Sequence, residues 1–124
     1  WEAAMYAAAK KIDNLISTVD VNAKQIDGST DDVLPMGSIQ AKFEAFGWHV
    51  ISVAKGNDLS AVKQALIEAT AASGNGKPVC ILLHTEMGNG VDFMMGTHKW
   101  HGVAPNDDQL ADALRQNPET LGDY

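Results

Sequence analysis

Apolar residues along the chain alternate between short continuous runs and longer stretches of helical periodicity. The runs predict strands near residues 15–20, 48–53 and 79–84, and periodicity predicts a helix near 58–71. Ala content without helix breakers predicts a helix near 1–11, and capping residues predict helices near 38–46 and 107–115. The third strand is apolar on both faces, as is typical of strands buried in a parallel sheet. This alternation of strands and helices predicts an α/β fold in which helices cover a parallel sheet.

Residues that cap helices support these positions. Ser38 can cap the second helix, and Gly47 can end it. Asn57 or Asp58 can cap the third helix, and Asn106 or Asp107 the last. Within the third helix, the apolar residues that fall on one face are Leu59, Val62, Leu66 and Ala69.

A polar stretch from residue 20 to residue 37 shows no clear periodicity and is expected to be a loop. Loops of this length inside a compact domain are usually functional. In a parallel sheet, ligands bind at the carboxyl ends of the strands. The segments following the predicted strands, at residues 20–22, near Asn57 and at 84–90, are therefore the places to look for chemistry.

Composition sets the scale of the molecule. A chain of 124 residues is long enough for one domain and too short for two of ordinary size. Apolar residues make up 45% and charged residues 20%, which is ordinary for a globular protein. No apolar run is long enough to span a membrane.

The charge argues against nucleic-acid binding, because a net charge of -7 without a Lys/Arg cluster repels phosphate backbones. The single cysteine, Cys80, excludes an internal disulfide. It lies within the third strand, where a buried, unreactive thiol is expected. This use of cysteine fits an intracellular protein.

The residues at both ends of the chain lead to expectations about how it continues in a longer protein. The chain does not begin with Met and opens directly on a helical pattern, so we expect the natural N-terminus to be missing. Residues 118–124 are typical of a loop, which could be either an interdomain linker or a natural terminus.

Asn22 is the first candidate for ligand chemistry. It follows the first strand and lies beside Asp20. An Asn side-chain oxygen suits Mg²⁺ or Ca²⁺ and leaves room for phosphate oxygens. The alternative is an Asn that hydrogen-bonds its own turn.

The other candidates are also open to two interpretations. Gly88 and Gly90 could let backbone approach a ligand closely, or could simply form a turn. His98 and His101 lie in a Gly- and Pro-containing stretch without Cys, Asp or Glu at zinc-ligand spacing, so the sequence disfavours a zinc site. A loop His that donates to phosphate or substrate oxygens is the better functional interpretation, and a surface His is the alternative. Glu2, on the opening helix, either faces water or meets a partner.

Taken together, several segments resemble transketolase, in order and spacing along the whole chain. They are Trp1-Glu2-Ala3-Ala4, Asp20-Val21-Asn22, Ile26-Asp27-Gly28, Phe46-Gly47-Trp48, Lys77-Pro78, Gly88-Asn89-Gly90 and Trp100-His101-Gly102-Val103-Ala104-Pro105. The resemblance implies that residues 1–124 form a single partial domain, the C-terminal part of the domain that binds the diphosphate of thiamine diphosphate.

The resemblance also implies a function and a set of site residues. The family transfers a two-carbon ketol unit between sugar phosphates, using thiamine diphosphate and Mg²⁺, and this implies a cytoplasmic enzyme of the pentose phosphate pathway. Asn22 matches a Mg²⁺ ligand, and Lys24 matches a position whose backbone carbonyl binds the same ion. Ile26 and Met87 match positions that pack on the cofactor. The matches with a catalytic role are His101, which would contact diphosphate and substrate, and Glu2, which resembles an interface glutamate linking the two active sites of a dimer.

The chain departs from the family pattern in what it lacks. The Gly-Asp-Gly motif, whose Asp binds Mg²⁺, should precede Trp1 and is absent. The pyrimidine-binding domain or subunit, which supplies the activating Glu, is absent as well. We therefore expect this polypeptide alone to bind cofactor weakly or not at all and to be inactive. We also expect apolar faces left uncovered to cause self-association through the first helix or a sheet edge.

Two rival interpretations remain at this point. The chain could be a stand-alone truncated module with an interaction or structural role and no catalysis. It could also belong to another thiamine diphosphate enzyme, such as a 2-oxoacid dehydrogenase or a deoxyxylulose-phosphate synthase. The Phe46-Gly47-Trp48 and Trp100-His101-Gly102 segments favour transketolase over both.

Overall fold

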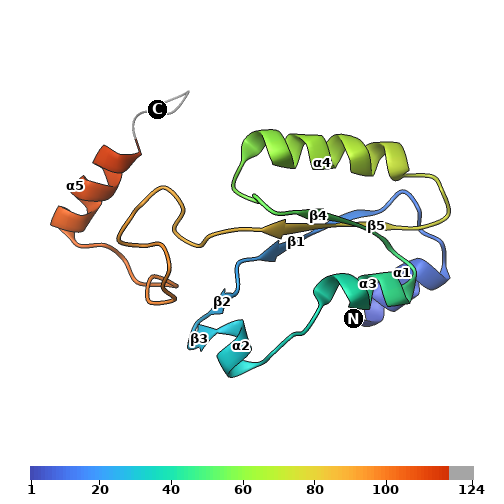
Figure 1. Ribbon diagram of the computed structural model, residues 1–124, viewed down its shortest axis with the longest axis horizontal. Coiled ribbons are helices and arrows are strands. Elements are labelled where there is room, and N and C mark those ends of the chain that lie inside the picture. Colours follow the sequence, from blue (N-terminus) through green and yellow to red (C-terminus); the bar gives the residue numbers. More distant parts are fainter. Residues whose placement is uncertain (118–124) are drawn as a thin grey trace.

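The structure, a computed structural model, describes residues 1–117. Its centre is a three-stranded parallel sheet in the order β1 (Ile16–Val21), β5 (Val79–His84), β4 (His49–Val53) (Figure 1). β5 pairs in parallel with both neighbours, so the predicted α/β fold with a parallel sheet is confirmed. No helix among residues 1–117 is long and apolar enough to cross a membrane.

β5 is the central strand because its residues are apolar on both faces. Val79, Cys80, Ile81 and Leu82 are all buried, and they alternate between two clusters of core residues on opposite sides of the sheet. The Cys80 thiol is buried as expected, and this burial raises its pKa from 9.0 to about 11. At neutral pH the thiol is therefore protonated and unreactive.

One face of the sheet is covered by α4 (Leu59–Ala72), which Figure 1 shows running above the strands. Asp58 caps this helix, with its Oδ1 accepting from the backbone N–H of Ser60 at 2.8 Å. The sequence interpretation of its apolar face was partly wrong, because Leu59 is 82% exposed and Leu66 is 44% exposed. The side chains that contact the sheet are smaller, and they recur every three or four residues: Ala61, Ala65, Ala69 and Ala72. Alanine lets a helix approach a sheet closely, so the small side chains face the strands and the larger ones face outward.

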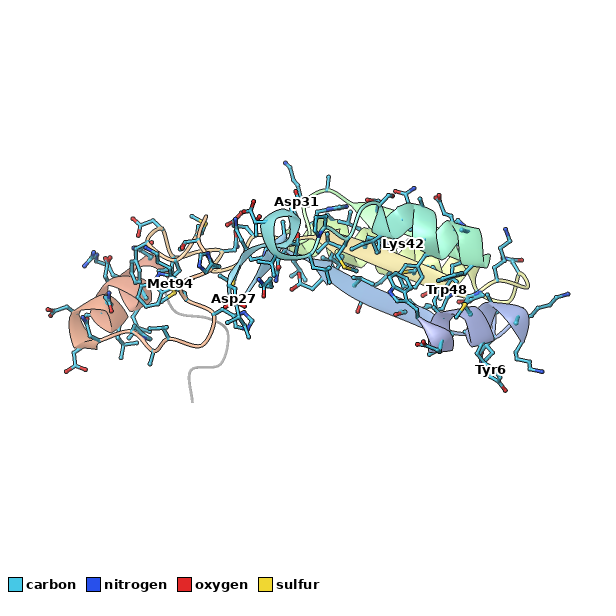
Figure 2. All side chains as sticks on the ribbon, turned by 90° about the horizontal axis from the view of Figure 1, so that it is seen from below. Tyr6, Asp27, Asp31, Lys42, Trp48 and Met94 are labelled. Carbon is cyan, nitrogen blue, oxygen red and sulfur yellow. The ribbon has the colours of Figure 1, made fainter. Side chains whose placement is uncertain are left out.

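The other face of the sheet is covered by α1 (Glu2–Ala9) and α3 (Ile39–Phe46). Phe43 and Trp48 form the centre of this layer, with ring centroids 5.2 Å apart. The indole Nε1 of Trp48 donates to the carbonyl of Ala4 at 2.9 Å, which fixes α1 against the strand β4 that follows Trp48. Figure 2 shows Trp48 and Lys42 on this side of the sheet, and Tyr6 pointing away from it.

α1 ends two residues earlier than predicted. Lys11 adopts a left-handed conformation with φ of 51°, and its N–H donates to the carbonyl of Ala8. The N–H of Ile12 donates to the carbonyl of Ala7 at 2.9 Å. These two bonds form a Schellman motif, which ends the helix before Asp13 is reached.

The polar stretch predicted as a loop contains short elements. β2 (Lys24–Gln25) pairs antiparallel with β3 (Gly28–Ser29), and α2 (Thr30–Val33) follows. The turn between the two strands consists of Ile26 and Asp27, so the Asp-Gly pair at residues 27–28 lies one position later than in the usual signal for a two-residue hairpin turn. The prediction of a loop without regular structure was therefore wrong for this segment.

After β5 the chain leaves the sheet through an irregular stretch and ends its described part in α5 (Asp107–Gln116). This helix begins as expected, at a capping box in which Asn106 and Gln109 bond each other's backbone N–H groups. Figure 1 shows α5 standing apart from the sheet, beyond the carboxyl ends of β1 and β5. The predicted linker or terminus at residues 118–124 lies outside the described residues.

Candidate functional site

The carboxyl ends of β1 and β5 lie side by side and bring two loops together. Val21 and His84 are the last paired residues, and the N–H of Thr85 still donates to the carbonyl of Val21 at 3.3 Å. The β2–β3 hairpin, α2 and the stretch that follows β5 all leave the sheet at this edge (Figure 1). The edge therefore has the position at which parallel sheets bind ligands.

Asn22 follows β1 directly and is held by its own turn. Its Oδ1 accepts from the backbone N–H of Lys24 at 2.9 Å, and its Nδ2 donates to Asp20 Oδ2 at 3.2 Å. Between them Ala23 has φ of 57°, a left-handed conformation that is unfavourable for a residue with a Cβ. Asn22 therefore does hydrogen-bond its own turn, as the alternative interpretation of this residue predicts. It leaves the second lone pair of Oδ1 for another donor or a cation.

Asp20 links the two loops, a role that the sequence interpretation did not assign. The hydroxyl of Thr85 donates to Asp20 Oδ1, while Asp20 Oδ2 accepts from Asn22. The carboxylate therefore ties the end of β1 to the start of the stretch after β5. Thr85 was missed because a single Thr after a strand carries no local signal, although its place at the carboxyl edge could have drawn attention to it.

A pocket of about 270 Å³ opens beside Asn22 and Lys24. Its lining residues are Asp20, Val21, Asn22, Ala23, Lys24, Thr30, Asp31, Met36, Gly37 and Ile39. The structure thus brings the two proposed metal residues to one pocket, whereas Ile26, Met87 and His101 are not part of its lining. Figure 2 shows Asp27 and Asp31 close to this region, at the hairpin and at α2.

Oxygen atoms suited to a hard cation are present in this pocket. These atoms are Asn22 Oδ1 and the Asp20 carboxylate oxygens, which belong to residues that line the pocket. Within residues 1–117, however, no group of three or more His, Cys, Asp or Glu side chains is placed to hold a metal ion. The donor set therefore fits Mg²⁺ in kind, and a complete shell would take further oxygens from phosphate or water.

Ile26 lies at the turn of the hairpin and is 65% exposed. At this exposure the apolar side chain buries little of its surface against the described residues. It is available for contact with another molecule at the carboxyl edge.

Met87 belongs to a tight turn that packs against its own loop. Gly88 has φ of 74°, and a Cβ placed on it would lie 2.7 Å from the Cβ of Met94. The N–H of Val91 closes the turn by donating to the carbonyl of Gly88 at 3.1 Å. Gly88 thus serves the fold of the loop, and Met87 is half-buried at its start.

His101 is exposed on a turn that is not helical. Its N–H donates to the carbonyl of His98 at 3.0 Å, and the N–H of Gly102 donates to that of Trp100. The ring of Trp100 fixes this turn, because its Nε1 donates to the carbonyl of Phe93 at 2.9 Å. The side chain of His101 is free to meet a ligand, whereas His98 is half-buried.

Glu2 lies at the start of α1, in the helix layer on one face of the sheet. Its carboxylate pairs with the N-terminal ammonium at 3.4 Å. The pKa of Glu2 is lowered by hydrogen bonding to its own backbone and, to a smaller extent, by the ammonium. Among the described residues, no hydrogen bond or ion pair connects Glu2 with the loops after β1 and β5.

Comparison with known proteins gives a consistent result over most of the chain. Residues 1–119 match the family model described as transketolase, thiamine diphosphate binding domain. The chain is 40% identical, over 103 residues, to a 6-deoxy-6-sulfo-D-fructose transketolase subunit of a Clostridium species, and 34% identical, over 123 residues, to one subunit of the apulose-4-phosphate transketolase of Phocaeicola vulgatus. These matches cover 83% and 98% of the chain, but only 36% and 42% of the two relatives.

Solved structures show the same likeness. The transketolase of Pichia stipitis in complex with sedoheptulose-7-phosphate is 30% identical and superimposes with a TM-score of 0.83 over 93% of the chain. The match covers 17% of the Pichia stipitis chain. The present chain therefore corresponds to about two fifths of the polypeptide in some relatives and to about a sixth of it in others.

Proposed function

Because the chain belongs to the transketolase family, we propose that it forms part of an enzyme that transfers a two-carbon ketol unit between sugar phosphates. The observation that carries this proposal is the match of residues 1–119 to the thiamine diphosphate binding domain. The relatives described above are transketolases, and the Pichia stipitis enzyme was solved with a sugar phosphate. This favours transketolase over the other thiamine diphosphate enzymes.

In this proposal the chain contributes one side of a cofactor site at the carboxyl ends of β1 and β5. Asn22 Oδ1 and the backbone carbonyl of Lys24 would hold Mg²⁺ together with oxygens of the diphosphate. The support is chemical, since Asn22 and Lys24 line one pocket and Asn22 Oδ1 is an oxygen of the kind that Mg²⁺ binds. When bound, thiamine diphosphate supplies the nucleophilic carbanion that accepts the ketol unit.

The remaining site residues act on the ligand from the neighbouring loops. Ile26 and Met87 provide apolar contacts to the cofactor, and the exposure of Ile26 leaves its side chain free for this. The exposed ring of His101 donates an N–H to the diphosphate or to a sugar-phosphate oxygen. An N–H donor facing an anion makes a charge-assisted hydrogen bond, which is stronger than a neutral one.

The active enzyme also requires a pyrimidine-binding domain or subunit, and we propose that it functions as a cytoplasmic homodimer. Glu2 would act at the dimer interface, where its exposed carboxylate can meet groups from a second polypeptide. The subunit names of the two relatives are consistent with a parent split into more than one chain. This polypeptide alone is inactive in the proposal, since a complete Mg²⁺ shell and the activating Glu come from elsewhere.

Titration calorimetry and an activity assay test the proposal together. The 124-residue chain should bind thiamine diphosphate and Mg²⁺ weakly or not at all. The same chain within the complete enzyme should bind both and transfer the ketol unit from xylulose 5-phosphate to ribose 5-phosphate. Turnover by the chain alone would contradict the proposed inactivity, and a complete protein that neither binds cofactor nor turns over would favour a purely structural module.

A further inference from the structure

The stretch that follows β5 has almost no apolar core of its own. Among residues 85–117, Val91 is the only buried residue that the structure describes, at 8% exposure. Apolar burial is the main force that fixes segments in a fold, and it contributes little here. The conformation of this stretch therefore depends on specific polar contacts.

The first of these contacts comes from the loop between β4 and α4. The N–H of Gly56 donates to the carbonyl of His84 at 2.7 Å. A Cβ on Gly56 would lie 2.7 Å from Thr85 Cγ2 and 2.8 Å from the carbonyl oxygen of His84, so the two backbones are in direct contact. Next to it, the side-chain oxygen of Asn57 accepts from the backbone N–H of Glu86 at 2.7 Å.

The loop that carries Asn57 is itself held firmly in place. The next residue, Asp58, caps α4, and its N–H donates to the carbonyl of Lys55 at 3.0 Å. The loop is thus held between a strand and a helix that both pack in the core. Asn57 presents a fixed acceptor to a segment that has few contacts of its own.

The side chain of Glu86 continues the connection. Its Oε1 accepts from the backbone N–H of Gly96 at 2.7 Å, and its carbonyl accepts from the N–H of Asn89 at 3.3 Å. Glu86 therefore closes both the short turn at Met87 and the longer loop that ends at Gly96. Trp100 follows this loop, and its Nε1 donates a hydrogen bond to the carbonyl of Phe93, which lies within the loop. The next residue is His101.

We propose that Asn57 and Glu86 are positioning residues, which hold the loop carrying Met87 and His101 in place beside the carboxyl ends of β1 and β5. This inference rests on the proposed function, because the position of His101 matters only if its side chain contacts the cofactor or the substrate. Neither side chain needs to touch the cofactor or the substrate. Each acts through a backbone N–H group of the loop: Asn57 through that of Glu86, and Glu86 through that of Gly96.

Hydrogen exchange in the 124-residue chain tests the structural part without any ligand. Asn57→Ala and Glu86→Ala should each speed exchange of amides between residues 86 and 101 by about five- to tenfold, as expected for the loss of one hydrogen bond of ordinary net strength. Amides of β1, β4 and β5 should be unaffected. Asn57→Asp and Glu86→Gln keep the accepting oxygen and should restore slow exchange.

A matched control is available in Asn75, whose side chain bonds the carbonyl of Ala72 at the opposite end of the sheet. Asn75→Ala also removes one hydrogen bond between a side chain and the backbone, here one that the side chain donates, and it should leave hydrogen exchange of residues 86–101 unchanged. The inference is wrong if Asn57→Ala and Glu86→Ala leave these amides as slow as in the unaltered chain. It is also wrong if the accepting replacements fail to restore protection.

Kinetics of the complete enzyme test the link to His101. Glu86→Ala should lower kcat/KM for the sugar phosphate by about five- to tenfold, the effect of one lost hydrogen bond, whereas Glu86→Gln should retain it. The double variant Glu86→Ala, His101→Ala should lose less kcat/KM than the product of the two single losses, because both changes act through the His101 side chain. Fully multiplicative losses would overturn the link. Failure of the proposed function would show differently, as absence of turnover in the unaltered enzyme.

Discussion

At the scale of single residues, left-handed backbone at non-glycine positions marks two critical turns. Lys11 ends α1 in a Schellman motif, and Ala23 forms the turn between Asn22 and Lys24. Both residues carry a Cβ that disfavours this conformation. At Ala23 the strained turn lies in the proposed metal-binding segment, whereas at Lys11 the conformation serves only to end the helix.

Lys11→Gly should stabilise the chain by about 0.5–1 kcal/mol, because glycine adopts positive φ without steric cost. Chemical denaturation of the two proteins would measure the difference. Lys10→Gly is the matched control, since Lys10 has φ of -89° and gains nothing from glycine. A lower stability for Lys11→Gly than for the unaltered chain would contradict the assignment of this motif.

Asn22 and His101 should differ in the kind of defect that they cause in the complete enzyme. Asn22→Ala removes a hard oxygen and should weaken the Mg²⁺-dependent binding of thiamine diphosphate. His101→Ala should mainly lower kcat/KM, because its ring is proposed to contact the diphosphate and the substrate. Calorimetry and steady-state kinetics separate the two effects. Unchanged cofactor affinity in Asn22→Ala would make the metal assignment wrong.

At the scale of elements, the packing of α4 shows that small residues decide which face of a helix meets the sheet. Leu59 and Leu66 have the spacing of a buried face, yet they point outward. Ala65 and Ala69 are buried against the strands instead. Periodicity in apolar residues identified the helix correctly but did not distinguish these two overlapping faces.

Ala65→Leu should destabilise the chain by about 1–3 kcal/mol, because the added side-chain atoms have no space between α4 and the sheet. Ala71→Leu on the exposed side of the same helix is the matched control and should change stability by less than about 0.5 kcal/mol. Thermal unfolding followed by circular dichroism would compare the two. Equal effects would show that α4 does not pack through its alanines.

At the scale of the whole molecule, the described three-stranded sheet has two open edges, β1 and β4, and an uncovered groove. Among the described strands, β1 pairs only with β5. Beneath it lies a groove of about 460 Å³ lined by Trp1, Ala3, Ala4, Leu15, Ser17, Val19, Met36, Ile39, Phe43 and Trp48. On the outer surface of α1, Tyr6 is 61% exposed (Figure 2). Apolar surface of this extent is typical of an interface.

The chain alone should therefore self-associate through α1 or the edge of β1, and sedimentation should detect species heavier than the 13.2 kDa monomer. Tyr6→Lys should reduce the association, because it places a charge in the apolar surface. Leu59→Lys introduces the same charge on the outer side of α4 and should have little effect. A monodisperse monomer of the unaltered chain at high concentration would contradict this prediction.

Local chemistry along the chain was enough to specify the three strands of the parallel sheet, the helices α1, α3, α4 and α5, and their order, but not the short elements β2, β3 and α2. The apolar strand at residues 79–84 could only be stable in the middle of a sheet, and the caps at Ser38, Asn106 and Gly47 follow from local backbone preferences. The segments shared with transketolase also pointed to the family, which the match over residues 1–119 confirms. Neighbouring residues encode all of these features, so they can be predicted before the chain is folded.

The way in which distant segments meet depended instead on the folded chain. The bond from Thr85 to Asp20, the bond from Glu86 to Asn57 and the burial of Ala65 each join residues from different parts of the sequence. No local pattern encodes such contacts, because they exist only after the strands have paired in register. The positions of the proposed site residues relative to one another are therefore a property of the fold, whereas their chemical types are a property of the sequence.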